Sequence, residues 1–309
     1  MDANAVNTLE SIRPNSLRAW FLAARPKTLT AAAVPVMIGA AYAWHLTDGI
    51  GYGFVPMALC FLFAFVMQID ANFVNDYYDC VRGRDDNTMR LGPKRACQQG
   101  WITLSAMRRA IAFTSLLACL TGLPLICYGG WELVGIGALC LLFCFLYTTS
   151  LAGKGLGDLL VLVFFGIIPC CFTAYVTLPA PLQRMDILPW PLALACGLVV
   201  DTLLLVNNYR DIDNDKATGK NTLVVMLGRK VTEMLYLLIV PAALIIVVAG
   251  VPARLIGVIL SLPTLLLHLF TWRMMCNIKR GTALNKVLGM AARNILIFGI
   301  MTTLLIIIA

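Results

Sequence analysis

The chain has 309 residues, of which 60% are hydrophobic and 13% are charged, and its mean hydropathy is +0.83. Soluble domains are roughly 45–50% apolar and about a quarter charged, so the composition excludes an ordinary water-soluble fold and indicates a protein that lipid partly solvates. The net charge of +8 does not indicate a nucleic-acid partner, because the basic residues follow the loops of a membrane protein.

Nine apolar runs are long enough to cross a bilayer as helices, which takes about 20 residues each. Helices are expected because they satisfy their own backbone polar groups in lipid, whereas these runs are too long for barrel strands. The first run is also too long for a signal peptide, and no small-residue cleavage pattern follows it. The sequence therefore predicts an all-α membrane protein. The approximate runs are 28–46, 53–80, 107–127, 131–150, 158–178, 188–208, 232–250, 252–272 and 287–308.

Basic residues are distributed unequally between the two sides of the predicted membrane. With nine spans, 22 of the 24 Lys and Arg residues fall on the side of the N-terminus, and the other side keeps Arg184 and Arg254. Lys and Arg concentrate in cytoplasmic loops. We therefore expect a multi-pass protein of the cell (inner or plasma) membrane, with residues 1–19 as a short cytoplasmic segment and the C-terminus outside.

Polar residues gather where the second and the sixth runs end. Residues three or four positions apart share one helix face, and Asn72, Asp76 and Asp79 of the first cluster follow this spacing. Each cluster is expected to present an amide and two carboxylates along one stripe. The second cluster repeats the pattern with Asn207, Asp211 and Asp215.

Carboxylates so close together repel each other, and the C-terminal end of a helix favours cations over anions. A divalent cation between the carboxylates would reverse both effects. Oxygen ligands that leave positions open for phosphate are typical of Mg²⁺ sites, and polar residues in or beside membrane spans are functional candidates. The clusters therefore predict metal sites. The alternative is that they are solvated charges at two helix ends.

A loop with basic residues follows each cluster. Arg90, Lys94 and Arg95 follow the first cluster, and Lys220 follows the second. Such loops suit a polyanion that metal holds from one side and Arg or Lys from the other. Cytoplasmic topology also explains part of this charge, although it does not explain why the charge adjoins the carboxylates.

The two clusters form a pair of extended motifs. The first reads Asn75-Asp76-x-x-Asp79-x-x-x-Gly83-x-Asp85, and the second reads Asn208-x-Arg210-Asp211-x-x-x-Asp215-x-x-x-Gly219-Lys220-x-Thr222-Leu223. Together they resemble the motifs of the UbiA-type intramembrane prenyltransferases. The resemblance runs from about residue 20 to residue 300. Further matching stretches are residues 25–29, residues 90–93, Tyr147, residues 155–158 and residues 165–166.

The resemblance implies one domain over residues 1–309, with nine helices around a central cavity that opens to the lipid. It also implies Mg²⁺, as two ions, and a polyprenyl diphosphate donor. Relatives that act on 4-hydroxybenzoate usually have Asp four residues after the second Asp of the first motif, where this chain has Gly83 and then Asp85. This difference favours the branch that prenylates 1,4-dihydroxy-2-naphthoate in menaquinone synthesis, with release of diphosphate and CO2 to give demethylmenaquinol.

The resemblance and the chemistry of the side chains together give expected roles at the donor site. Lewis-acid neutralisation by the metal promotes ionisation of the allylic C–O bond. Lys220, helped by Arg90, Lys94 or Arg95, would stabilise the departing diphosphate as a catalytic cation. The allyl cation needs a dry site lined by aromatic rings. The expected metal ligands are Asp76 and Asp79 for one ion and Asp211 and Asp215 for the other, with Asn72 and Asn207 completing the shells.

The expected roles at the acceptor site rest on fewer features. Arg25 or Lys27 would orient the acceptor carboxylate at the start of the first span. Asp158 and Asp201 would take part in proton transfer from the acceptor, unless Asp158 only caps the helix that follows the glycine-rich turn. The remaining expected substrate contacts are Asn75, Asn208, Arg210 and Tyr147.

Several alternatives remain open. Within the family, the acceptor could be 4-hydroxybenzoate, homogentisate, chlorophyllide, haem or a glycerophosphate. A cation-coupled transporter is the alternative from another class, because two similar motifs can indicate an internal repeat. Transporter carboxylates are expected near the bilayer midplane, whereas these lie at helix ends. A scaffold protein would leave the paired clusters unexplained.

Overall fold

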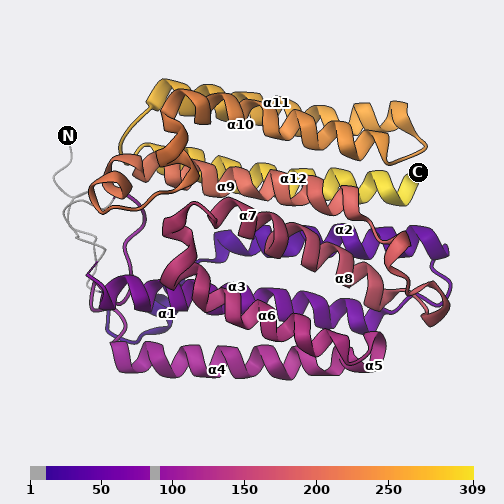
Figure 1. Ribbon diagram of the computed structural model, residues 1–309, viewed down its shortest axis with the longest axis horizontal. Helices are drawn as coiled ribbons and strands as arrows, with labels where there is room; N and C mark the ends of the chain where they lie inside the picture. Colours follow the sequence, from indigo (N-terminus) through magenta and orange to yellow (C-terminus); the bar gives the residue numbers. More distant parts are fainter. Residues whose placement is uncertain (1–11, 84–90) are drawn as a thin grey trace.

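The computed structural model describes residues 12–83 and 91–309, and within these ranges all regular structure is helical. The long helices lie nearly side by side along one axis (Figure 1). The helices are α1 (Leu17–Ala24), α2 (Leu29–Thr47), α3 (Phe54–Val81), α4 (Leu104–Gly122), α5 (Ile126–Gly129), α6 (Glu132–Leu146), α7 (Gly157–Leu162), α8 (Ile168–Thr177), α9 (Trp190–Ala217), α10 (Leu223–Ala249), α11 (Arg254–Ile278) and α12 (Leu284–Ile308).

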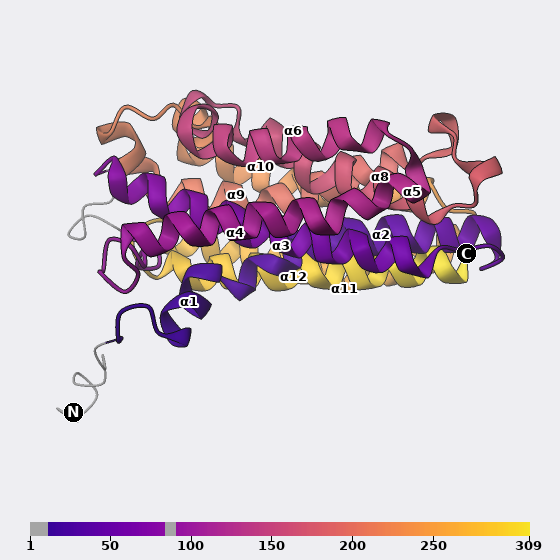
Figure 2. The same ribbon diagram turned by 90° about the horizontal axis from the view of Figure 1, so that it is seen from below.

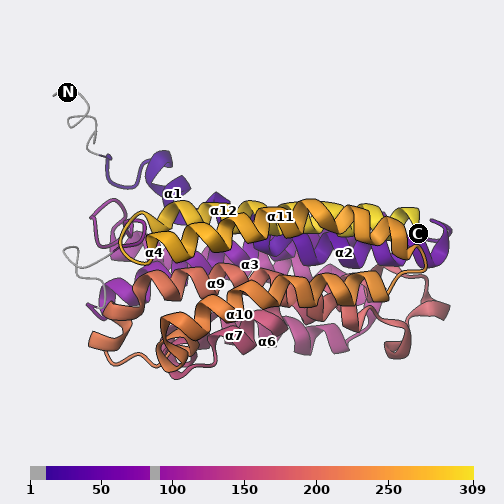
Figure 3. The same ribbon diagram turned by 90° about the horizontal axis from the view of Figure 1, so that it is seen from above.

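Nine helical segments in the described part of the chain are long and apolar enough to cross a membrane. They coincide with the nine apolar runs of the sequence, so the prediction of an all-α, multi-pass membrane protein is confirmed. Large apolar side chains such as Leu116, Ile245 and Leu266 are exposed on the outside, as lipid contact requires. Because the number of spans is odd, α1 and the C-terminal Ala309 lie at opposite ends of the bundle (Figures 2 and 3).

The first span begins with a bend. Helix α1 ends at Ala24, and α2 begins only at Leu29 after the short 3₁₀ turn Pro26–Thr28. Arg25 makes the turn with φ of 51°, a left-handed conformation that is uncommon outside glycine. Its carbonyl accepts hydrogen bonds from the backbone N–H and from the hydroxyl of Thr28. The bend places residues 25–28 at the polar end of the bundle interior.

The fifth span is interrupted by a π-helical turn, Val163–Ile167, between α7 and α8. Gly166 within this turn touches α9 backbone to backbone, since a Cβ atom on it would lie 2.6 Å from Gly197 Cα. Only glycine fits at such a contact. The close approach packs this turn of the fifth span against α9, which carries the second cluster.

Helix α9 is the most enclosed of the nine spans, and the fourth span is the least. In the apolar window of α9, 61% of the residues are buried, against 11% in Glu132–Lys154. Helix α9 packs against α10, α12 and α7, with Val199, Leu205 and Val206 in the core. The second cluster therefore stands on a rigid, central element, whereas the fourth span lies between the interior and the lipid.

Candidate functional site

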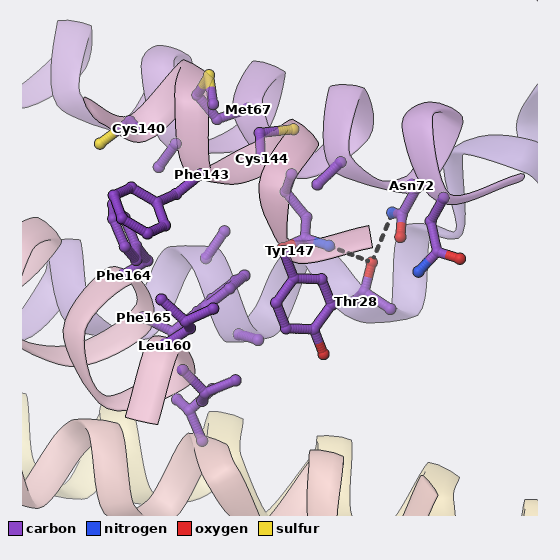
Figure 4. A pocket seen from close by; sticks show the side chains of 18 of the residues that line it. Thr28, Met67, Asn72, Cys140, Phe143, Cys144, Tyr147, Leu160, Phe164 and Phe165 are labelled. Atoms are coloured by element: carbon purple, nitrogen blue, oxygen red, sulfur yellow. Dashed lines mark hydrogen bonds between the residues drawn. The ribbon is translucent and has the colours of Figure 1, made fainter. Parts of the chain in front are cut away.

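A cavity of about 1090 Å³ lies inside the bundle. Its body is apolar and aromatic, and Phe143, Phe164 and Phe165 are among the side chains that line it (Figure 4). The rings of Phe143 and Phe164 are 5.0 Å apart between centroids. At one end the lining changes to amides, carboxylates and basic side chains from both clusters. One space therefore joins a polar pocket to an apolar channel.

Three side chains of the first cluster line this polar end: Asn72, Asn75 and Asp79, all on α3. They occupy positions i, i+3 and i+7, which form one helix face. The hydroxyl of Thr28 accepts hydrogen bonds from Asn72 Nδ2, at 3.0 Å, and from the Gln68 amide, and the first of these is drawn in Figure 4. These bonds fasten the bend between α1 and α2 to α3.

Asp76 occupies a different face of α3. It is 1% exposed, and among the described residues it does not line the cavity. Its two carboxylate oxygens accept hydrogen bonds from the backbone N–H groups of Ala96 and Cys97, each at 2.9 Å. The spacing of the first cluster predicts Asp76 as a metal ligand, but both of its carboxylate oxygens accept hydrogen bonds that hold a loop.

The loop held by Asp76 carries Arg95 into the first cluster. Arg95 Nη2 donates to Asn75 Oδ1 at 2.6 Å and to Asp79 Oδ2 at 2.5 Å. Burial, together with the charge of Asp76, raises the pKa of the neighbouring Cys97 thiol, so this cysteine stays protonated and inert. Lys94 also lines the cavity. Arg90 lies outside the described residues.

The second cluster is arranged around Arg210, which is 3% exposed. Its Nε and Nη2 donate to the two oxygens of Asp211 at 2.8 and 2.6 Å, and Nη2 also donates to Asn207 Oδ1 at 2.8 Å. A bidentate pair of this kind fixes the orientation of the carboxylate. Lys220 Nζ lies 3.4 Å from Asp215 Oδ1. The residues of the second motif and its neighbours that line the cavity are Asn207, Asn208, Arg210, Asp211, Asn214, Asp215, Lys220 and Thr222.

The remaining predicted residues divide into two groups. Arg25, Lys27 and Tyr147 line the cavity, and Tyr147 opens a π-helical turn that Arg82 holds by donating to the Thr149 carbonyl at 2.7 Å. In contrast, Asp158 on α7 and Asp201 on α9 are buried and interact electrostatically with each other. Within residues 12–83 and 91–309 they are not part of the cavity lining.

Sequence reasoning missed Asn285, in the first turn of α12. Its Oδ1 accepts from Arg210 Nη1 at 2.8 Å, and its Nδ2 donates to the Leu91 carbonyl at 2.8 Å. It lines the cavity. A polar residue at the start of an apolar run was a visible signal, but it resembles any helix end that faces water.

Residues 32–304 match the UbiA prenyltransferase family. The chain belongs to this family. It is 39% identical over 222 residues to 1,4-dihydroxy-2-naphthoate octaprenyltransferase of Escherichia coli, a match that covers 68% of this chain and 69% of the relative. It is 34% identical over 224 residues to the enzyme of the same name from Mycobacterium tuberculosis, covering 72% and 74% of the two chains.

Solved structures of UbiA homologues share the fold. A UbiA homologue from Aeropyrum pernix gives a TM-score of 0.65 at 19% identity and covers 87% of this chain and 96% of its own. A homologue from Archaeoglobus fulgidus, solved with DMAPP and Mg²⁺, gives 0.57 at 13% identity and covers 94% and 99%. The chain is thus a membrane-embedded prenyltransferase of the UbiA family, and the transporter and scaffold alternatives are set aside.

The oxygen donors of the UbiA-type cavity suit Mg²⁺. No group of three or more His, Cys, Asp or Glu side chains that could hold a metal occurs in the described ranges. The cavity instead offers Asp79 on one side and Asp211 with Asp215 on the other, next to the amides of Asn75 and Asn207. Mg²⁺ is usually bound through one or two carboxylates, with water and substrate phosphate completing its octahedron. The donor set fits this ion.

Proposed function

We propose that this chain transfers a polyprenyl group from polyprenyl diphosphate to 1,4-dihydroxy-2-naphthoate in a Mg²⁺-dependent reaction. The products would be diphosphate, CO2 and demethylmenaquinol. The observation that carries the proposal is a single cavity in which two oxygen-rich clusters meet at one end and an apolar, aromatic channel continues from them. The acceptor rests on the relatives, which are named 1,4-dihydroxy-2-naphthoate octaprenyltransferases.

The polar end would bind the diphosphate of the donor. Asp79 with Asn75 on α3 would hold one metal ion, and Asp211 and Asp215 with Asn207 on α9 would hold the other. When bound, the metal supplies charge neutralisation for the leaving diphosphate. Arg95, Arg210 and Lys220 add fixed positive charge around the same space, and cations that are already in place cost no reorganisation when negative charge develops.

The apolar channel would receive the prenyl chain and protect the reacting carbon. When the allylic C–O bond breaks, its electron pair leaves with the diphosphate. The faces of Phe143, Phe164 and Phe165 favour the resulting cation, and their bulk excludes water that would otherwise capture it. Tyr147 stands where the polar and aromatic parts of the lining meet (Figure 4), close to the expected position of the reacting carbon.

The acceptor would enter beside the bend between α1 and α2. Arg25 and Lys27 line the cavity there and would pair with the acceptor carboxylate. The ring carbon that bears this carboxylate supplies the electron pair for the new C–C bond. Loss of CO2 then returns an electron pair to the ring, so the step needs no external base at that carbon.

Mass spectrometry of the lipid products tests the proposal. Purified protein would receive Mg²⁺, a polyprenyl diphosphate and, in separate reactions, 1,4-dihydroxy-2-naphthoate, 4-hydroxybenzoate and homogentisate. We expect a decarboxylated prenyl product from the naphthoate and little product from 4-hydroxybenzoate or homogentisate. If the naphthoate carries an isotopic label in its carboxyl group, the label should be recovered as CO2. Prenylation of 4-hydroxybenzoate at comparable kcat/KM with the carboxyl retained would refute the acceptor assignment.

The orientation in the membrane belongs to the same proposal. We place the two clusters and the N-terminus on the cytoplasmic side and the C-terminus outside, because the basic residues favour that side. We also treat residues 1–309 as one domain, since both clusters and α12 contribute to one cavity. Reporter fusions at the two termini should show a cytoplasmic N-terminus and an external C-terminus. The reverse pattern would contradict the orientation.

A further inference from the structure

The last helix reaches both clusters through one side chain. Asn285, in the first turn of α12, binds the backbone of the loop behind the first cluster and the arginine of the second. Leu91, whose carbonyl it binds, is 194 positions away in the chain, and Arg210 is 75 positions away. Contacts of such separation arise only from the packed fold.

The orientation of the Asn285 amide is determined by its partners. Its oxygen faces a guanidinium N–H, and its nitrogen faces a carbonyl. Turning the amide over would set N–H against N–H and oxygen against oxygen, so both bonds would be lost together. The donors and acceptors around Asn285 therefore match this amide orientation and not the reversed one.

Arg210 transmits the effect of Asn285 to Asp211. A guanidinium has five N–H donors in a rigid, planar fork. Here Nε and Nη2 donate to Asp211, Nη2 also donates to Asn207, and Nη1 donates to Asn285. The Arg210 side chain is 2% exposed, while that of Asp211 is 24% exposed. The arginine therefore lies behind the carboxylate, and its orientation determines how Asp211 faces the cavity.

The loop that contains Leu91 passes directly over the same arginine. A Cβ atom on Gly92 would lie 2.7 Å from Arg210 Nη2, so any larger residue here would require the loop or the guanidinium to move. Three residues further on, Arg95 reaches Asn75 and Asp79 of the first cluster. The loop is thus held at one point by Asp76 and at another by Asn285.

We propose that Asn285 is a positioning residue of the prenyl-transfer site, which fixes Arg210 behind Asp211 and fixes the 91–95 loop so that Arg95 meets Asp79. The inference rests on the proposed function in one respect only, that the two clusters bind the diphosphate of the donor. Residues that orient ligating carboxylates are typically worth 10–100-fold in metal affinity or activity.

The experiment compares Asn285→Ala with Asn294→Ala. Asn294 lies on the same helix and is a buried amide, which donates to Thr271 Oγ1 at 2.8 Å and to the Leu267 carbonyl at 3.2 Å. Within the described residues it does not line the cavity. It is therefore a control for the loss of two amide hydrogen bonds on the same helix without loss of a contact to either cluster.

Binding of inorganic diphosphate with Mg²⁺, measured by calorimetry in detergent, is the first readout. Asn285→Ala should weaken this binding by about 10–100-fold, whereas Asn294→Ala should bind as the wild type does. In turnover, Asn285→Ala should raise the donor KM and the Mg²⁺ concentration for half activity, and should leave the acceptor KM unchanged. Equal behaviour of the two variants in all these measurements would overturn the proposal.

Gly92→Ala gives an independent test if Asn285→Ala does not fold. The added methyl must displace either the loop or the Arg210 guanidinium, although the substitution itself deletes no hydrogen-bonding group. We expect the same rise in the diphosphate Kd, and wild-type binding would contradict the proposal. If the wild-type protein binds diphosphate but prenylates none of the acceptors, the proposed function fails in its acceptor while the binding comparison still decides the role of Asn285.

Discussion

The two clusters look alike in sequence, yet they are built in different ways. In the second, Asp211 and Asp215 both face the cavity, and the supporting Arg210 is adjacent to Asp211 on the same helix. In the first, Asp79 is the only carboxylate among the described residues that faces the cavity, and its arginine arrives from a loop 16 residues later. The other carboxylate, Asp76, holds that loop from behind.

This difference shows that equal spacing does not mean equal function. The second cluster is largely complete on one helix, and that helix is the most enclosed span. The first depends on tertiary contacts, because its cation reaches it only while the loop stays in place. We therefore expect damage to the second cluster to affect chemistry directly, and damage behind the first cluster to act through the loop.

Removal of divalent metal should have the largest effect, since it disables both clusters together. The enzyme treated with EDTA should show no turnover, and Mg²⁺ should restore it, because an uncompensated diphosphate is a poor leaving group. Product formation measured against free Mg²⁺ tests this expectation. Full activity in the presence of excess chelator would show that the carboxylates serve another purpose.

Loss of one carboxylate that faces the cavity should have the next largest effect. Asp211→Asn and Asp79→Asn should each lower kcat/KM by about 10²–10³-fold, the range seen when one stabilising group is removed from a reacting site. Asp213→Asn is the matched control, because Asp213 lies on the same helix but is 64% exposed and pairs with Arg229. A comparable loss in Asp213→Asn would point to a general effect of charge.

Asp76→Asn should separate the two kinds of carboxylate. The amide nitrogen would face a backbone N–H of Ala96 or Cys97, so one hydrogen bond is lost and a buried donor is left unsatisfied. This costs about 1–3 kcal/mol of stability. Denaturation in detergent should show the loss, and the Mg²⁺ concentration for half activity should rise less than in Asp79→Asn, because Asp76→Asn loosens the loop but keeps the carboxylate of Asp79. A large shift in Mg²⁺ dependence with unchanged stability would restore Asp76 as a metal ligand.

The contrast between the clusters also shows what sequence can predict. All nine spans were predictable because lipid demands long apolar helices, and this demand is local to each run. Which side chains of the first cluster face the cavity was not predictable. By helical spacing, Asn72 can share a face with Asp76 and Asp79, or equally with Asn75 and Asp79. Only the backbone of Ala96 and Cys97, 20 and 21 positions from Asp76, decides between them.

The smallest predicted effect concerns the acceptor and lies on the side of the first cluster. Asn72 and Gln68 fasten the bend at Thr28 to α3, so Lys27 in that bend lies beside the first cluster and not beside α9.

If Lys27 pairs with the acceptor carboxylate, Lys27→Gln removes one charge-assisted contact, which is worth about tenfold in affinity. The acceptor KM should rise by about that factor, and the donor KM should not change. Lys27→Arg keeps the charge and should recover most of the loss. Steady-state kinetics with each substrate varied in turn distinguishes this role from diphosphate binding, because a cation that serves the leaving group would raise the donor KM instead and would leave the acceptor unaffected.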